Sequence, residues 1–226
     1  MKNSGFLVVN KPVGPTSHDI VNQLRKITGI KKIGHAGTLD PFAGGVLVLA
    51  IGRNATKQID KIVKTQKKYK AQICLGVVTD THDSTGKIIE ENKIEFITRK
   101  KIKKVLKNFQ GRQKQIPPMF SAKKIKGEKL YNLARQGKIV EREPVEIEVY
   151  ELKLKNYDFP GVEIEIICSS GTYIRSLAYD IGQELECGAY LKELQRTAVG
   201  DYTLKNAVNP EILTSQNWTE YLITNT

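Results

Sequence analysis

The order of apolar and polar positions along the chain predicts a series of strands separated by helices. Residues 46–51 are uninterruptedly apolar, which is typical of a central strand, and residues 5–10 contain a second short apolar run. Between residues 162 and 168, apolar side chains alternate with glutamates, which is the period of a half-buried strand. Residues 69–76 and 87–91 predict two further strands.

Helical periodicity separates these strands. Thr16 stands three residues before Asp19, as in a capping box, so we expect a helix that begins there and ends at Gly29. The same spacing predicts three more helices: residues 56–63, a lysine-rich helix that begins at Thr98, and residues 174–185 with Gly188 as the C-cap. The chain lacks the regular strand–helix repeat of a doubly wound or barrel fold. We therefore predict an α+β fold, with a long, mixed, mostly antiparallel sheet flanked by helices.

Length and composition limit the class of protein. A chain of 226 residues with 40% hydrophobic content can bury a sizeable core. No stretch approaches the ~18 apolar residues of a membrane span, and the first apolar run is too short for a signal peptide. Cys74, Cys168 and Cys187 are scattered and odd in number, which favours reduced thiols in a cytoplasmic protein.

Positive charge is concentrated in one segment. The chain has a net charge of +12, and residues 99–138 hold 14 Lys/Arg against a single acidic residue, Glu128. A surface that binds a polyanion gathers charge in this way, because each neutralised phosphate releases counterions. A solvated lysine-rich face is the alternative. An amphipathic membrane helix is excluded, because prolines and glycines interrupt the segment.

A glycine-rich loop carries the strongest candidate for chemistry. Asp40 lies between Gly37 and the pair Gly44-Gly45, and Pro41 follows it directly. Glycines let the backbone approach a ligand closely, and proline fixes the chain after the carboxylate, as a reactive group requires. An ordinary turn aspartate is the alternative reading. A Walker-type phosphate loop is excluded, since no GKS or GKT follows.

Five ordered blocks of sequence resemble the TruB-type tRNA pseudouridine synthases. The loop block, GHAGTLDPFAGGVLVLAIG, resembles the catalytic loop of that family. The opening GFLVVNKP resembles its first strand, and the segment from KYK to THD resembles the one that carries its active-site tyrosine. The segment QIPPMFSA, with LY and ARQG, resembles its RNA-gripping insertion, and GTYIR with LQRT resembles its last active-site stretch.

The resemblance implies the pseudouridine synthase fold over residues 1–208, with a thumb-like insertion at about residues 113–142. It also implies an isomerase that converts the T-loop uridine of tRNA, at position 55, to pseudouridine after flipping the base out of its stack. The reaction breaks the C1′–N1 bond and rejoins the uracil through C5 without redox change, so we expect no cofactor. Residues 209–226 are expected to form a tail too short for the PUA domain of bacterial relatives. A monomer whose catalytic domain alone recognises the T stem-loop is therefore expected.

The same resemblance suggests the central residues of the site. Asp40 matches the catalytic carboxylate, which either adds to the uracil ring or abstracts a sugar proton; the sequence leaves both routes open. Arg175 matches the cation that keeps this carboxylate ionised. Tyr69 matches the ring that stacks on the flipped uracil and assists proton transfer at C5. Tyr173 and Leu194 match the walls of the pocket.

Further polar residues complete the predicted site. His35 matches a residue that helps to hold the displaced nucleotide region, and Asp83 is expected to support the site from a turn. Asp80, His82 and Asp83 are close enough to suggest a metal site, but no second ligand cluster is visible, so we predict none. The predicted phosphate contacts are Lys11, Lys123 and Lys129.

Other classes of function stay open. A non-catalytic tRNA-binding chaperone on the same fold would explain the charge, but it needs none of the four residues Asp40, Tyr69, Tyr173 and Arg175 together. A synthase directed by guide RNA within a protein complex is less favoured, because long terminal extensions are missing. A basic protein of ribosomal type would leave the glycine-framed aspartate unexplained.

Overall fold

The first two long strands of the chain pair along their whole length. The computed structural model describes residues 4–121, 123–125, 127–138 and 140–223. Strand β1 (Gly5–Lys11) runs antiparallel to β3 (Gly44–Ile51), and β2 (Ile33–His35) pairs antiparallel with β3 as well. Every side chain of β3 is buried, because alternate residues enter hydrophobic clusters on the two faces of the sheet. This explains the uninterrupted apolar run.

The chain divides into two units. One comprises residues 1–69 and 194–226, and the other comprises residues 70–193. Strands β4 (Lys67–Leu75) and β12 (Ala189–Val199) pass from one unit into the other. The sheet order is β1-β3-β12-β4-β11-β10-β7. In it, β12 runs parallel to β3, whereas the pairs β1–β3, β11–β10 and β10–β7 are antiparallel. The predicted α+β class with a mostly antiparallel mixed sheet is therefore confirmed.

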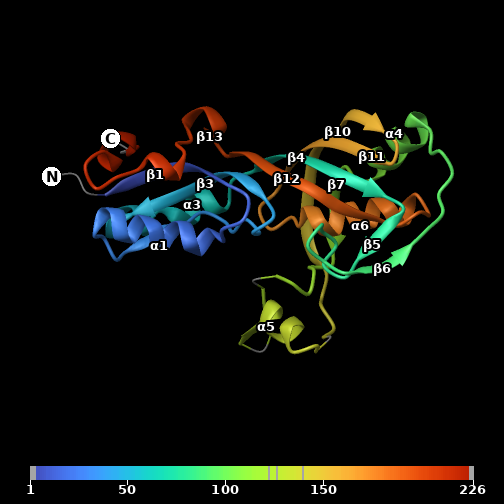
Figure 1. The fold of residues 1–226 in the computed structure, drawn as a ribbon, viewed down its shortest axis with the longest axis horizontal. Helices are drawn as coiled ribbons and strands as arrows, with labels where there is room; N and C mark the ends of the chain where they lie inside the picture. The colour runs from blue at the N-terminus through green and yellow to red at the C-terminus, as the bar shows by residue number, and fades with distance from the viewer. Residues whose placement is uncertain (1–3, 122, 126, 139, 224–226) are drawn as a thin grey trace. The chain divides into compact units, whose positions relative to one another are not determined.

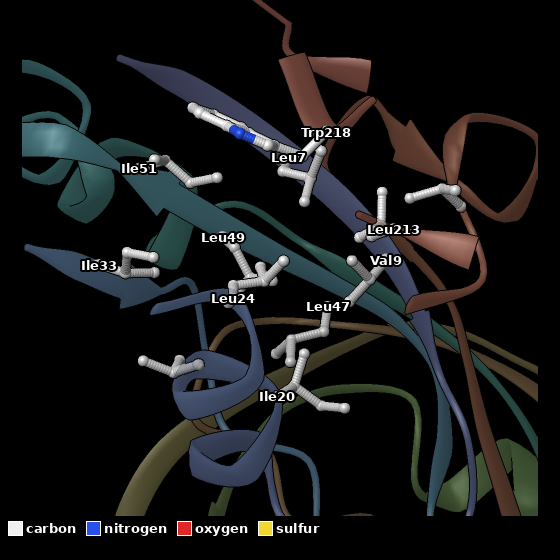
Figure 2. Packing of buried hydrophobic residues seen from close by; sticks show 12 residues of the cluster. Leu7, Val9, Ile20, Leu24, Ile33, Leu47, Leu49, Ile51, Leu213 and Trp218 are labelled. Carbon is white, nitrogen blue, oxygen red and sulfur yellow. The ribbon is translucent and has the colours of Figure 1, made fainter. Parts of the chain in front are cut away.

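A hydrophobic core of the first unit lies between its sheet and helix α1 (Ser17–Thr28) (Figures 1 and 2). In Figure 2, Ile20 and Leu24 of α1 point toward the strand that carries Leu47 and Leu49. Trp218, which opens the 3-10 helix η3 (Trp218–Tyr221), is buried in the same cluster. Complete burial of one such side chain contributes about 1.5–3 kcal/mol.

Local signals set the ends of α1 as expected. The Thr16 hydroxyl accepts from the backbone N–H of Asp19, the Asp19 carboxylate accepts in return from the backbone of Thr16, and Gly29 caps the C-terminus at φ 69°. The helix expected over residues 56–63 is instead two short helices, α2 (Gly52–Thr56) and α3 (Ile59–Val63). The chain turns between them, so the prediction of one continuous helix was wrong.

The first unit is completed by short elements near the C-terminus. Strand β13 (Tyr202–Thr203) pairs with the end of β12, and three single-turn 3-10 helices follow. They are η1 (Leu204–Asn206), η2 (Pro210–Ile212) and η3. Ile223 then bridges to Phe6 of β1. Residues of the tail therefore add to the core of the first unit.

The second unit is organised around its longest strand. β10 (Val145–Asp158) pairs antiparallel with β11 (Gly161–Cys168) on one side and with β7 (Gly111–Gln115) on the other. Helix α4 (Arg99–Asn108) packs against β10, and Figure 1 shows it beside β10 and β11. A separate hairpin is formed by β5 (Val77–Thr79) and β6 (Ile88–Glu91).

Helix α6 (Ile174–Glu184) ends earlier than the pattern suggested. Its C-cap is Leu185, so the expectation that Gly188 caps it was wrong. Gly188 instead has φ 70°, and a Cβ there would lie 2.7 Å from the side chain of Val78. Glycine is needed at this position for a close approach to β5 rather than for ending the helix.

The insertion between β7 and β10 has little regular structure. It holds a small hairpin, β8 (Lys124–Ile125) with β9 (Glu128–Lys129), followed by helix α5 (Leu130–Arg135). Backbone bonds from Leu130 N to Lys123 O and from Tyr131 N to Ser121 O tie the start of the helix to the residues that precede β8. Within the described residues, no helix has the length and apolar character to cross a membrane.

Candidate active site

Asp40 lies in the loop between β2 and β3, and backbone hydrogen bonds hold this loop at several points. The Ala43 N–H donates to the Asp40 carbonyl at 3.1 Å, which closes a tight turn directly after the carboxylate. The Gly14 N–H donates to the Pro41 carbonyl at 2.8 Å. The Ala36 N–H donates to the Val48 carbonyl at 2.8 Å, so the start of the loop is also fixed to β3.

Ser17, the first residue of α1, fixes the backbone of the residue before Asp40. Its hydroxyl accepts from the Leu39 N–H at 2.8 Å and donates to the Leu39 carbonyl at 3.1 Å. Ser17 and Leu39 are both buried, so these bonds are shielded from water. The peptide preceding Asp40 is therefore held on both sides.

Arg196, on β12, braces the same loop from within the core of the first unit. Its side chain is almost fully buried, and its guanidinium donates to the carbonyls of Val46, Gly37 and Thr38 at 2.8, 3.0 and 3.4 Å. A planar guanidinium can serve several acceptors at once. Sequence reasoning missed this role, because the only signal was the presence of Arg196 in a resembling block.

Gly45 makes the approach of β12 to β3 possible. It pairs with Arg196 in the parallel ladder and has φ 107°. A Cβ at this position would lie 2.2 Å from the carbonyl oxygen of Arg196. The second glycine of the pair after Asp40 is thus required by backbone packing, which places Arg196 where it can reach the loop.

Lys11 is buried at the end of β1 rather than exposed to solvent. Its ammonium donates to the carbonyls of Pro12 and Pro15 at 2.8 and 2.7 Å. Burial lowers the pKa of Lys11 to about 8; attraction to Asp40 opposes this shift and repulsion from Arg196 adds to it. The attraction is mutual, so a charged Lys11 favours the carboxylate form of Asp40. A phosphate contact by Lys11 stays an untested prediction, and its burial gives that prediction no support.

His35, at the end of β2, belongs to the same electrostatic group. Burial is the main cause that lowers the pKa of its imidazole, and the charge of Arg196 lowers it further. At neutral pH the ring is therefore uncharged. The structure thus brings three of the predicted residues, Lys11, His35 and Asp40, into one neighbourhood around Arg196 within the first unit.

Two more predicted residues of the first unit lie on its long strands. Tyr69, on β4, is buried, and Leu194, on β12, is partly buried. Their roles in walling or stacking on a base stay predictions.

In the second unit, Arg175 and Asp83 form a buried ion pair. Arg175 lies in the first turn of α6, and its Nη1 is 3.3 Å from Oδ2 of Asp83, both side chains being about 95% buried. The guanidinium also donates to the carbonyls of Thr81 at 3.1 Å and Phe120 at 2.7 Å. A buried pair with this many hydrogen bonds holds the guanidinium in one orientation.

Asp83 organises the turn that precedes β6. Its Oδ1 accepts from the hydroxyls of Thr81 and Thr85 at 2.8 and 2.6 Å and from the Thr85 N–H at 2.9 Å. These bonds saturate one oxygen and leave the other for Arg175. Asp83 thus holds the Arg175 guanidinium in place, while its predicted support of the active site stays a prediction.

His82 precedes Asp83 in a left-handed conformation, φ 60°. Its imidazole stacks on Tyr179 of α6, with ring centroids 4.1 Å apart and an interplanar angle of 6°. Burial, with the charges of Arg175 and Arg142, lowers the pKa of His82 to about 4. A neutral ring packed on α6 therefore holds the turn against the helix that carries Arg175.

Gln115 fixes the backbone of Tyr173, the second aromatic residue predicted for the site. Its side-chain amide accepts from the Tyr173 N–H at 2.8 Å and donates to the Tyr173 carbonyl at 3.0 Å. Ser176 donates to the Ile116 carbonyl at 3.0 Å, so the first residues of the insertion are bound to the start of α6. Gln115 is a second positioning residue that local sequence signals did not reveal.

The two predicted lysines of the insertion are only partly described. Lys123 is partly exposed, and its ammonium reaches the Glu143 carbonyl at 3.5 Å. The side chain of Lys129 lies outside what the structure describes. Among the described residues, no group of three His, Cys, Asp or Glu side chains is arranged to hold a metal ion.

The chain is similar in sequence to known proteins over nearly its whole length. Residues 25–174 match the TruB family pseudouridylate synthase (N terminal domain), and residues 175–224 match the tRNA pseudouridylate synthase B C-terminal domain. The tRNA pseudouridine synthase B of Protochlamydia amoebophila is 50% identical over 222 residues, which are 98% of this chain and 84% of that protein. Its counterpart from Clostridium tetani is 45% identical over 220 residues, 97% of this chain and 76% of that protein.

Solved structures agree with these matches. A chain of a Cbf5-Nop10-Gar1 complex superposes with a TM-score of 0.74 at 29% identity, over 96% of this chain and 56% of that one. A chain of an H/ACA RNP bound to a substrate RNA containing 2'-deoxyuridine superposes with a TM-score of 0.69 at 27% identity, over 96% of this chain and 55% of that one. The chain thus spans little more than half the length of these structural neighbours.

The fold and these matches define the class of protein as a pseudouridine synthase. Within that class, the chain belongs to the TruB family, the tRNA pseudouridine synthases B.

Proposed function

We propose that this protein isomerises the T-loop uridine of tRNA, at position 55, to pseudouridine, with Asp40 as the catalytic carboxylate. The observation that carries the proposal is the bracing of the Asp40 loop by Ser17 and Arg196. A loop held at this many backbone atoms presents its carboxylate in one place, and a reacting group needs such pre-organisation. An aspartate that only forms a turn does not require a buried arginine to hold its loop.

The chemistry demands an ionised carboxylate. Pseudouridine formation breaks the C1′–N1 bond, turns the uracil and joins C1′ to C5, from which one hydrogen is lost. Asp40 starts this sequence either by adding to the ring or by taking a sugar proton, and both routes begin from the anion. Lys11 supports that state, because its ammonium is near enough for attraction to Asp40.

Arg175 is proposed as the second cation of the reaction centre, with Asp83 as its positioning residue. The ion pair and the two carbonyl acceptors fix the guanidinium while leaving it charged. Tyr69 is proposed to stack on the flipped uracil, and Tyr173 and Leu194 to wall its pocket. The neutral imidazole of His35 is suited to a hydrogen bond with the displaced nucleotide region rather than to an ion pair with phosphate.

We further propose that residues 113–142 form a thumb that grips the T stem-loop. The insertion is basic, and its first residues are bonded to the start of α6 through Gln115 and Ser176. Movement of the insertion on RNA binding would therefore reach Tyr173 and Arg175 directly. Lys123 and Lys129 are the proposed phosphate contacts within it.

The test is release of tritium from tRNA that carries C5-labelled uridine. The variants are Asp40→Asn and, as a matched control, Asp60→Asn, which makes the same change at an exposed position of α3. We expect wild type and Asp60→Asn to release tritium and Asp40→Asn to release none while still binding tRNA. Wild type that binds tRNA but releases no tritium would instead favour the non-catalytic tRNA chaperone.

A further inference from the structure

Helix α4 carries six basic residues and no acidic one. All six are exposed, and none of them forms an ion pair within the part of the chain that the structure describes. They are Arg99, Lys100, Lys101, Lys103, Lys104 and Lys107. None of these residues belongs to the loop of Asp40, to the Arg175 network or to the proposed thumb. The basic segment seen in the sequence therefore forms two separate features, α4 and the insertion.

The charges on α4 are gathered on one side of the helix. Ile102, Val105 and Leu106 are buried on one face, so the helix is anchored by its apolar stripe. Four of the lysines are three or four residues apart and so share the face opposite that stripe: Lys100, Lys103, Lys104 and Lys107. Like charges four residues apart repel, and cations in the first turn oppose the helix dipole, so this arrangement costs α4 stability. A bound polyanion would offset that cost.

A groove beside α4 extends the positive surface onto β10. The groove has a volume of about 480 Å³, and its basic lining comes from Lys103 and Lys107 of α4 and from Lys153 and Lys155 of β10. Among the described residues that line it, no carboxylate is present. The β10 lysines each have an acidic neighbour, Lys155 lying 3.1 Å from Glu165, so the uncompensated charge comes from α4.

We propose that this α4 basic surface, defined as Lys100, Lys103, Lys104 and Lys107 with the adjoining groove, binds the phosphate backbone of the tRNA substrate. The proposal rests on the proposed function, which supplies the RNA. Lysines act as point charges, so the surface adds affinity and orientation without reading sequence. An anionic bilayer is disfavoured as the partner, because the apolar residues of α4 are buried and cannot insert.

The test compares two sets of three neutralised lysines. The variant Lys103→Gln/Lys104→Gln/Lys107→Gln removes charge from α4, and the control Lys57→Gln/Lys61→Gln/Lys64→Gln removes it from exposed positions around α2 and α3. Binding of full-length tRNA is measured over a salt series. Each lost phosphate contact lowers the slope of log K against log salt by about 0.7 to 0.9. For the three lysines of the α4 variant we expect a fall of up to about 2.7 in this slope and at least about a fivefold loss of affinity.

A third variant separates charge from folding. Lys103→Arg/Lys104→Arg/Lys107→Arg keeps the charge, so we expect wild-type affinity and salt slope. Equal affinity and slope in the α4 and control glutamine variants would overturn the proposal. Failure of the arginine variant to restore binding would also overturn it. Tritium release by wild type tests the proposed function, whereas differences in tRNA binding between the variants test the α4 basic surface. The two proposals can therefore fail separately.

Discussion

At the residue scale, the Asp40 region is distinguished by buried positive charge. Lys11 and Arg196 are both almost inaccessible to solvent, and both donate to backbone carbonyls. Burying a charge is costly unless hydrogen bonds and an opposite charge compensate it. For Lys11 the compensation is incomplete, because burial still lowers its pKa to about 8. Lys11 therefore changes its charge in an accessible range of pH.

We expect tritium release at saturating tRNA to fall as the pH rises above about 8, because Lys11 then loses the charge that strengthens its hydrogen bonds to the Pro12 and Pro15 carbonyls. These bonds hold the turn whose Gly14 N–H donates to the Pro41 carbonyl, directly after Asp40. Lys11→Arg should keep its activity above that pH, since a guanidinium stays protonated. Lys11→Met should be less active at neutral pH, by about tenfold, and should lack this limb of the profile. If tritium release still falls above about pH 8 in both variants, a group other than Lys11 causes the fall.

The same shift has a consequence for stability. The native state releases the Lys11 proton at about pH 8, whereas the unfolded chain holds it to 10.5. Between these values the unfolded state binds more protons, so stability rises with pH over that window. Lys11→Met should remove this rise, which urea denaturation at a series of pH values would measure.

At the element scale, the close pairing of β3 with β12 is what brings Arg196 to the loop. The pairing depends on Gly45, where a Cβ would overlap the backbone of Arg196. Backbone atoms cannot move aside as a flexible side chain can. Strand register, and not only the identity of the loop residues, therefore determines whether Asp40 is held in place.

Gly45→Ala is expected to destabilise the protein by more than about 3 kcal/mol, because strain and overlap add. Gly111→Ala is the matched control: its φ is +96° but no atom lies within 4 Å of the added Cβ. The control should cost only the conformational strain, about 1–2 kcal/mol. Urea denaturation of both variants gives the difference, and equal losses would show that β12 does not approach β3 this closely.

At the scale of the whole molecule, the residues proposed for the reaction are distributed over two compact units. Asp40, Lys11 and Arg196 lie in one, and Arg175 with Asp83 lies in the other. The proposed thumb, residues 113–142, is an insertion in the second unit, bonded at its base to α6. RNA that is gripped by the thumb would cover the basic residues of this segment.

We expect tRNA to slow tryptic cleavage within residues 113–142 by about tenfold or more, because a covered and ordered segment is a poorer substrate. Cleavage after Lys205, an exposed residue of η1, serves as the internal control and should keep its rate. Mass spectrometry of the fragments would follow both sites. Cleavage of the insertion at the same rate with and without tRNA would contradict the thumb.

Sequence alone determined much of this protein, because the relevant signals are local. The capping box of Thr16 and Asp19, the apolar run of β3 and the loop around Asp40 each occupy a short stretch, and their meaning does not depend on distant residues. The ordered blocks also identified the family, which the comparisons confirm. Roles for Asp40, Tyr69 and Arg175 came from that resemblance and stay predictions.

Tertiary structure alone decided which residues support these groups. Arg196 meets the loop across more than 150 positions of sequence, and Gln115 meets Tyr173 across 58. The burial of Lys11 at the end of β1 could not be seen in the sequence, and Gly188, which was expected to end a helix, instead allows the close approach of β5. Hydrophobic period and capping reflect interactions within a few residues, whereas these contacts depend on strand register and packing, which only the folded chain sets.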